Sequence, residues 1–460
     1  MQPCPWNDLF GGSALARCGW LKVAENRDAP AGKTLRLRVT VIPALRSTPE
    51  PDAFVILAGG PGQSAHDVYS AAAAAFTAIR RDRDILLVDQ RGTGRSNRLD
   101  CNFTQQADLE VIDPARLREL ARGCLAALPG DPRFYTTSVA VRDLEDLRAA
   151  LGYRQLTLYA GSYGTRVAQH YLRRYPSRVR AAILDGVVPV GLPLGPDIAP
   201  RAQRALDAIF ERCKVDAACA TAFPKLHDQF DALRARLERG AVEVQLPDPV
   251  TAEPVTTRFG TAQLGGAVRL LTYSDETASV LPLLIHQAQT LQRPQSLAAQ
   301  YLMIERNTTA QLAQAMHFSV VCSEDAPLWG PELPAGGTDA ATYLGAGFMA
   351  GLRAICAVWP RGPVDQDFNA PLHSDVPVLI LSGGNDPVTP PDYGVRALPA
   401  FENGRHLVLD GQGHGQLLNG CMPNVVAQFV RTAKADALAV ECLKNVVPAP
   451  FLLSPNGSGA

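Results

Sequence analysis

Residues 156–165 read Leu-Thr-Leu-Tyr-Ala-Gly-Ser-Tyr-Gly-Thr, and the residues that follow, 166–172, have the pattern of a helix. An apolar run that ends in a serine between small residues and passes directly into a helix is the sequence form of a nucleophile elbow. The turn strains the backbone of its serine, and a reactive hydroxyl is the usual reason to keep it. The usual pattern is Gly-x-Ser-x-Gly, and here Ala160 replaces the first glycine. Alanine is small enough for the turn, so Ser162 is predicted to be a nucleophile, with a chance surface turn as the alternative.

Four further apolar runs each lead into a loop rich in glycine. They cover residues 53–58, 85–89, 377–382 and 405–410. The loop after the third run carries Asp386, and the loop after the fourth carries His414. Serine, aspartate and histidine therefore follow one another in the chain order of an α/β-hydrolase triad.

Five short motifs surround these residues. They are Gly-Gly-Pro-Gly at 59–62, Asp-Gln-Arg-Gly-Thr-Gly-Arg-Ser at 89–96, Gly-Ser-Tyr-Gly-Thr at 161–165, Asn-Asp-Pro-Val-Thr-Pro at 385–390 and Gly-Gln-Gly-His-Gly at 411–415. In this order they resemble the proline-iminopeptidase and tripeptidyl-aminopeptidase branch of the α/β hydrolases. The tripeptidyl-aminopeptidase type is most similar, because Cys421 follows the histidine and the middle of the chain is long. The resemblance covers about residues 35–190 and 371 to the C-terminus, and it implies a serine peptidase.

Strand-like and helix-like patterns alternate along both of these parts. Further apolar runs lie at 155–160 and 181–188, and helical patterns lie at 67–80, 138–151 and 163–174. This alternation predicts an α/β-hydrolase fold with a mostly parallel, doubly wound sheet. Residues 34–42 alternate between apolar and polar side chains, which predicts a half-exposed, antiparallel strand at the start of the sheet.

A long insertion is expected between the serine and the aspartate, after the sixth core strand. Its helical patterns lie at 201–213, 222–239, 261–272, 279–292, 294–306 and 344–357, and loops rich in Pro and Gly lie at 189–200 and 328–338. A structureless loop of this length would be unusual in a compact protein. We therefore expect a hydrolase core in two parts, 1–190 and 371–460, with a large, mainly helical cap at 191–370 over the active site.

Each expected site residue has a chemical role. His414 would take the proton of Ser162, and Asp386 would hold the imidazole in the right tautomer. The developing oxyanion would be bound by the N–H group of Tyr163 and by that of Gly60, where glycine lets the backbone come close.

Some of these roles have rivals. Asp185 also follows a strand and could supply the triad acid, whereas its alternative role is to bind backbone N–H groups of its own turn. Asp89 and Arg91 are expected to brace neighbouring loops rather than to take part in chemistry.

An aminopeptidase should offer a carboxylate to the ammonium group of its substrate, because an unpaired charge in a closed site is costly. Glu324 and, after it, Asp325 are the candidates, since they follow Cys322 in the predicted cap. The alternative is a solvated loop that caps a helix.

Ten cysteines with no metal-ligand spacing favour disulfides and an oxidising compartment, with buried free thiols as the alternative. The sequence alone leaves about 900 pairings open. Chain proximity together with the family resemblance implies the pairs 4–18, 101–124, 213–219, 322–356 and 421–442. The first residues do not form a signal peptide, so we expect that a leader is missing and that the protein is periplasmic or secreted in a bacterium.

The composition limits the partners. A net charge of −1 and an isoelectric point near 6.7 give no reason to expect nucleic acid or an anionic membrane. No apolar stretch reaches the roughly 18 residues of a membrane span. No cofactor or metal is implied, and the oligomeric state does not follow from the sequence. We expect an exopeptidase that releases one to three residues from the free N-terminus of short peptides. The alternatives are a carboxylesterase or amidase with the same triad, and a silent binding protein with a hydrolase fold.

Overall fold

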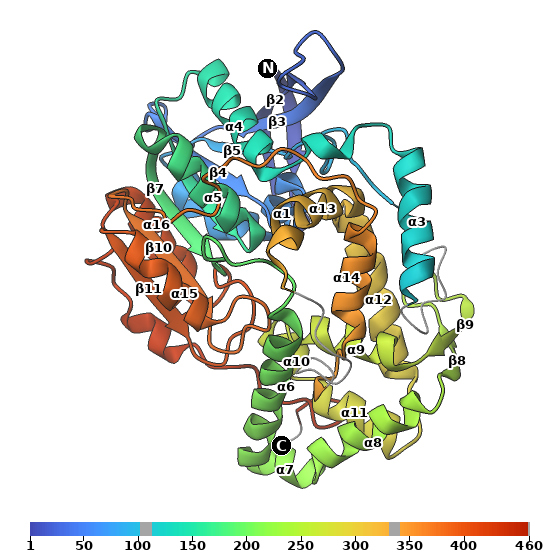
Figure 1. Ribbon diagram of the computed structural model, residues 1–460. Helices are drawn as coiled ribbons and strands as arrows, with labels where there is room; N and C mark the ends of the chain where they lie inside the picture. The colour runs from blue at the N-terminus through green and yellow to red at the C-terminus, as the bar shows by residue number, and fades with distance from the viewer. Residues whose placement is uncertain (102–112, 331–340, 459–460) are drawn as a thin grey trace.

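The computed structural model describes residues 1–101, 113–330 and 341–458. Within them, nine strands form one central sheet in the order β1-β2-β3-β5-β4-β6-β7-β10-β11 (Figure 1). The strands are β1 Gln2–Asn7, β2 Ser13–Ala24, β3 Thr34–Ile42, β4 Asp52–Leu57, β5 Ile85–Val88, β6 Gln155–Gly161, β7 Val179–Asp185, β10 Val378–Gly383 and β11 Gly404–Leu409. From β5 to β11 all neighbours are parallel, whereas β1, β2 and β3 are antiparallel, as is the pair β3–β5. The predicted mostly parallel sheet and the antiparallel strand at 34–42 are confirmed.

The hairpin β1–β2 was not predicted from the sequence. Its first strand is largely exposed and contains Pro3 and Pro5, so it lacks the apolar alternation that announces a strand. The hairpin makes β7 the seventh strand along the chain rather than the sixth, and the insertion follows the strand that was predicted at 181–188.

Helices cover both faces of the sheet, because the buried strands present apolar side chains in both directions. On β4, Val55 and Leu57 pack into one core cluster and Phe54 and Ile56 into the other. The first cluster contains residues of α3 (Pro114–Ala127), α4 (Thr137–Leu151), α5 (Tyr163–Arg174) and α15 (Pro391–Ala397). The second contains residues of α1 (Ala65–Ala72), α2 (Thr77–Arg80) and α16 (Met422–Thr432). This is the doubly wound arrangement that the sequence predicts.

The segment between β7 and β10, residues 186–377, is called the insertion below. It contains α6 Ile198–Val215, α7 Ala217–Ala222, α8 Leu226–Glu238, the hairpin β8 Val242–Pro247 with β9 Pro254–Phe259, α9 Thr261–Leu271, α10 Asp275–Ala278, α11 Leu281–Gln289, α12 Gln295–Gln311, α13 Gln314–Val320 and α14 Gly347–Cys356. All six predicted helical segments correspond to helices here, whereas the hairpin was missed. The predicted loop at 328–338 lies outside the described residues from 331 onward.

The insertion has a core of its own and also shares side chains with the hydrolase core. Its own cluster is built by α6, α8, α9, α11 and α12. Met316 of α13 and Ile355 of α14 belong instead to the core cluster beside the sheet. The end of the chain returns to the insertion, where Phe451 is buried and the backbone N–H of Leu452 donates to the carbonyl of Ser279 at 3.1 Å. The C-terminal residues, which were expected to belong to the hydrolase core at 371–460, therefore also pack against the insertion.

All five implied disulfides are present. They join Cys4 to Cys18, Cys101 to Cys124, Cys213 to Cys219, Cys322 to Cys356 and Cys421 to Cys442, which leaves no free cysteine. No helix in the described part of the chain is long and apolar enough to cross a bilayer.

Candidate active site

Ser162 occupies a strained turn between β6 and α5. Its φ is 53° and its ψ is −124°, a region that residues other than glycine rarely adopt. The turn is held by its backbone, since the N–H of Ser162 donates to the carbonyl of Asp185 at 2.8 Å. Its own carbonyl accepts the hydroxyl of Thr165 at 2.6 Å. A β-carbon at Gly164 would lie 2.2 Å from the carbonyl oxygen of Leu57, so only glycine fits there. The predicted elbow is therefore the observed local structure.

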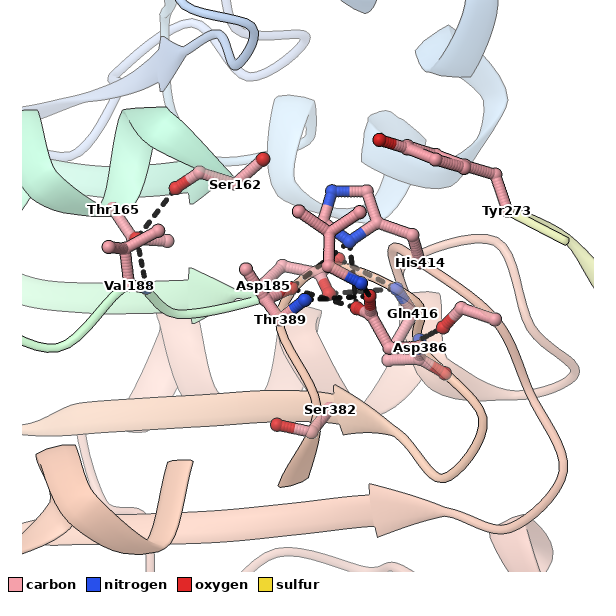
Figure 2. A network of polar contacts seen from close by, with 12 residues as sticks. Ser162, Thr165, Asp185, Val188, Tyr273, Ser382, Asp386, Thr389, His414 and Gln416 are labelled. Carbon is pink, nitrogen blue, oxygen red and sulfur yellow. Dashed lines mark hydrogen bonds and ion pairs between the residues drawn. The ribbon is translucent and has the colours of Figure 1, made fainter. Parts of the chain in front are cut away.

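His414 and Asp386 meet at the carboxyl end of the sheet. Nδ1 of His414 lies 2.7 Å from Oδ2 of Asp386 (Figure 2). The other carboxylate oxygen, Oδ1, accepts the backbone N–H groups of Val388 and Thr389, each at 2.8 Å. Together these contacts fix both the carboxylate and the edge of the imidazole that faces it.

The electrostatics of this pair favour a charged carboxylate. Burial works to raise the pKa of Asp386, but His414 and the hydrogen bonds outweigh it and hold that pKa below its ordinary value. Burial likewise works to lower the pKa of His414. The charge of Asp386, with a smaller contribution from Asp185, outweighs burial, so the pKa of His414 is raised. The imidazole is therefore a stronger base than free histidine.

Thr389 is a member of this network that the sequence did not identify. Its hydroxyl donates to Oδ2 of Asp386 at 2.8 Å and lies 3.1 Å from Nδ1 of His414. A β-carbon at Gly186, whose φ is +70°, would lie 2.8 Å from that hydroxyl and 3.0 Å from Cε1 of His414. The position of Thr389 three residues after the acid was the available signal.

The carboxylate of Asp185 binds backbone N–H groups, whereas that of Asp386 faces the imidazole of His414. Asp185 accepts the backbone N–H groups of Gln416 at 2.8 Å and Leu417 at 3.1 Å, and the hydroxyl of Tyr159 at 2.9 Å. Burial raises its pKa. The carboxylate of Asp185 therefore anchors the loop that carries His414. The alternative role, in which it binds backbone N–H groups of its own turn, is not what the structure shows.

The hydroxyl of Ser162 points toward the imidazole of His414 (Figure 2), with no hydrogen bond between them among the described residues. Catalytic hydrogen bonds are often long before a substrate binds, so the orientation of the hydroxyl is compatible with proton transfer to His414.

The Gly-Gly-Pro-Gly loop lies against the serine. A β-carbon at Gly59 would stand 3.0 Å from Cβ of Ser162, and Gly60 follows it with a φ of +107°. The second expected oxyanion donor, the N–H of Tyr163, is at the N-terminus of α5. The loop is backed by the insertion, since His317 of α13 lies 3.1 Å from the carbonyl of Pro61.

Glu324 and Asp325 lie in a buried π-helical turn, Val321–Asp325, rather than in a solvated loop. Glu324 accepts the backbone N–H of Thr137 at 2.6 Å, and the hydroxyl of Thr137 lies 2.6 Å from that of Tyr163. Burial, with the neighbouring Asp325 adding to it, raises the pKa of Glu324 to about 7.

Asp325 is paired with a core arginine. Nη2 of Arg166 lies 2.8 Å from Oδ1 of Asp325, and Nη1 lies 3.5 Å from Glu324. The N–H of Leu194 also donates to Asp325 at 2.7 Å. Thr137 of α4 and Arg166 of α5 thus already bind the two carboxylates that were predicted to hold the substrate ammonium group.

The insertion also reaches the triad residues directly. The carbonyl of Tyr273, which follows α9, accepts the N–H of His414 at 2.6 Å, and the two rings stand 5.3 Å apart. A β-carbon at Gly413 would lie 2.2 Å from that carbonyl, which explains the glycine before the histidine. This long-range contact has no local sequence signal.

A cleft of about 490 Å³ opens beside His414, within the size range of small-ligand sites. Its lining comes from several parts of the chain and includes Asp67 of α1, Leu9 of the first hairpin, Gln311 of the insertion and Leu418, which follows the His414 loop. The described residues contain no group of three His, Cys, Asp or Glu side chains placed to hold a metal ion.

Comparisons with known proteins agree with this geometry. Residues 52–238 match the family model described as alpha/beta hydrolase fold, and residues 341–442 match the model described as TAP-like protein. The chain is therefore a serine hydrolase of the α/β-hydrolase fold, as the topology and the elbow indicate.

Several relatives are similar over nearly the whole chain. Serine protease Hip1 of Mycobacterium tuberculosis is 25% identical, with 96% of this chain and 91% of Hip1 covered. Tripeptidyl aminopeptidase of Streptomyces lividans is 26% identical, with 97% and 87% covered. Carboxylesterase B of M. tuberculosis is 27% identical, with 93% and 86% covered. Among solved structures, proline iminopeptidase of Mycobacterium smegmatis has 14% identity and a TM-score of 0.44 over 90% of this chain and 98% of its own.

Proposed function

We propose that this hydrolase is an aminopeptidase that releases one to three residues from the free N-terminus of short peptides. The observation that carries the proposal is the pairing of His414 with the buried Asp386, next to a serine held in an elbow. The relatives named as a serine protease and a tripeptidyl aminopeptidase support peptide bonds as the target.

In the proposed reaction, Ser162 Oγ attacks the carbonyl carbon of the scissile bond while His414 accepts the hydroxyl proton. The N–H groups of Tyr163 and Gly60 stabilise the oxyanion. His414 then returns the proton to the leaving nitrogen as the carbon–nitrogen bond breaks, which leaves an acyl-enzyme on Ser162. Water then attacks the acyl carbon while His414 accepts its proton, and His414 passes that proton to Ser162 Oγ as the bond from Oγ to the acyl carbon breaks and the acid leaves. Asp386 stabilises the imidazolium in both halves.

The insertion would limit the substrate to short peptides, because Tyr273 and Gln311 border the triad residues and the cleft. Glu324 and Asp325 stay a prediction as the amine anchor. An ammonium group would have to share them with Arg166 and Thr137. The variant Glu324→Gln separates the two roles. If Glu324 binds the ammonium group, the variant should lose more activity on free-amine substrates than on esters. If Glu324 is purely structural, the activity on both classes should fall equally.

An esterase or amidase is the second candidate, supported by the relative named carboxylesterase B. The same triad and oxyanion donors act on esters and amides alike. A catalytically silent binding protein with this fold is the third candidate, and a fluorophosphonate probe that fails to label Ser162 would support it.

The five disulfides support a periplasmic or secreted location, since such bonds persist in oxidising compartments. Cell fractionation of the source bacterium with an antibody to the protein tests this part of the proposal. Recovery in the cytoplasm would contradict it.

The activity is tested with tripeptidyl p-nitroanilides that have either a free or an acetylated N-terminus. An aminopeptidase should cleave the free form and leave the blocked form intact, and Ser162→Ala should remove the activity. Equal rates on both forms would refute the aminopeptidase proposal. Rapid turnover of simple esters with no peptide cleaved would establish the esterase instead.

A further inference from the structure

Arg269, on α9 of the insertion, lies at the edge of the site. Its Nη2 donates to the hydroxyl of Tyr273 at 3.1 Å. The guanidinium carbon is 5.7 Å from the centre of the Tyr273 ring and 5.5 Å from that of Phe348. The arginine therefore sits between two aromatic side chains, with one of its five N–H donors bound to a hydroxyl.

Within the described ranges, no carboxylate forms an ion pair with Arg269. Its Nε is buried and has no hydrogen-bond partner. A cation that is partly removed from water normally has an anion beside it, because an unpaired charge in such a place is costly. The other arginine near the elbow, Arg166, does have two such partners.

The charge of Arg269 acts on the site. It opposes protonation of both His317 and His414. Burial lowers the pKa of His317, and Arg269 adds to that effect. Burial and Arg269 also work to lower the pKa of His414, but Asp386 outweighs them and raises it. The ring of Tyr273 stands 5.3 Å from the imidazole of His414, and in the view of Figure 2 its hydroxyl end is turned to the side on which Ser162 lies. The guanidinium that binds this hydroxyl is therefore one side chain away from the imidazole of His414.

We propose that Arg269, oriented by the hydroxyl of Tyr273, binds a carboxylate of the substrate. A guanidinium binds carboxylates through parallel N–H donors, and only one of the five donors of Arg269 is bound to the Tyr273 hydroxyl. Two sources carry this group, namely an acidic side chain and the C-terminal carboxylate of a short peptide. The inference deepens the proposed peptidase function and rests on it, since it names a feature of the substrate.

A structural role is the competing explanation. Arg269 could serve only to hold Tyr273, and through it the loop of His414. In that case its loss would slow every substrate to the same degree, whatever the charge of that substrate.

The experiment compares Arg269→Gln and Arg269→Lys with the parent enzyme, and Arg239→Gln serves as the matched control. Arg239 is an exposed arginine of the same insertion, so its variant makes an equal change in net charge. The substrates come in pairs that differ only in the carboxylate. One pair is Ala-Ala-Ala-Glu-amide and Ala-Ala-Ala-Gln-amide, another is Ala-Ala-Ala-Ala with a free or amidated C-terminus, and a third is mono-p-nitrophenyl glutarate and its methyl ester.

We expect Arg269→Gln to raise KM for the carboxylate-bearing member of a pair by about 10- to 100-fold, which is the value of a charge-assisted hydrogen bond. The neutral member should change less than about threefold, Arg269→Lys should be intermediate, and Arg239→Gln should match the parent. An effect confined to the glutamate pair assigns the site to a side chain, and one confined to the C-terminal pair assigns it to the chain end. Equal losses within every pair, or no change in any, would overturn the proposal.

The ester pair separates this inference from the proposed function. If no peptide is cleaved but the glutarate preference depends on Arg269, the carboxylate site stands and the peptidase activity does not. If peptides are cleaved without any dependence on charge, the peptidase stands and the carboxylate site falls.

Discussion

Replacing Asp386 with asparagine tests the triad at its best-defined contact. Oδ1 of Asp386 accepts two backbone N–H groups, from Val388 and Thr389, each at 2.8 Å. The amide oxygen of the asparagine must take this position, because the opposite orientation would set an NH₂ group against two donors. The NH₂ group then faces Nδ1 of His414, where the carboxylate oxygen stood at 2.7 Å.

Two donors cannot share a hydrogen bond, so the imidazole will carry its proton on Nε2 and leave Nδ1 as the acceptor. In that tautomer Nε2 cannot accept the proton of Ser162. In serine hydrolases this exchange costs about 10⁴-fold in kcat, which corresponds to about 5.5 kcal/mol of transition-state stabilisation.

The assay is kcat for a tripeptidyl p-nitroanilide at saturating concentration, or for a p-nitrophenyl ester if esters are the better substrates. Ser162→Ala supplies the baseline, and the thermal midpoint shows whether the variant is folded. A folded Asp386→Asn enzyme that keeps more than a tenth of the parental kcat would refute the assignment of Asp386 as the triad acid.

Three further outcomes follow from the same contacts. First, the pKa of His414 is raised, and only the neutral imidazole can accept a proton. The value of kcat/KM should therefore fall as the pH is lowered, with a midpoint above the usual histidine pKa of about 6.5. A pH–rate profile with its midpoint below 6 would contradict this prediction. Glu324 has a pKa of about 7 when folded, above its unfolded value, so its contribution to stability is complete at low pH and is lost as the pH rises toward 7. Urea unfolding should therefore show that Glu324→Gln loses less stability at pH 8 than at pH 5, and the opposite order would show that Glu324 is charged in the fold. Replacing Cys322 and Cys356 by serine opens a loop with a sequence separation of 34, so the free energy of unfolding should fall by about 4 kcal/mol in a denaturant titration. A fall of less than about 1 kcal/mol would mean that packing alone holds the turn that contains Glu324.

The residues that the sequence identified best are those held by local backbone geometry. Ser162, Asp386 and His414 each follow a strand of the parallel sheet and stand in a short motif whose small residues are required by close approach, as at Gly164 and Gly413. The structure gives the reason for each glycine. Parallel strands with apolar side chains on both faces were equally clear.

The missed features depend on contacts between distant parts of the chain. Tyr273 and Arg269 lie in a helical region of ordinary composition, and only the folded insertion places Tyr273 beside His414, with Arg269 bound to Tyr273. The same holds for the burial of Glu324 against Thr137, which a local pattern of acids after a cysteine could not reveal. The hairpin β8–β9 was missed although β8 alternates apolar and polar residues, because each strand is only six residues long and the pair lies between segments with helical patterns.

The anchoring of the His414 loop by Asp185 affects how mutants of this enzyme will be read. A screen that scores turnover alone would rank Asp185→Ala beside Asp386→Ala, because freeing Gln416 and Leu417 displaces the base as effectively as removing its partner disorients it. Two acids would then look equally catalytic, although only one of them touches the imidazole. The variants differ in temperature dependence: the loop defect should deepen on warming, whereas the tautomer defect should be present at every temperature at which the protein is folded.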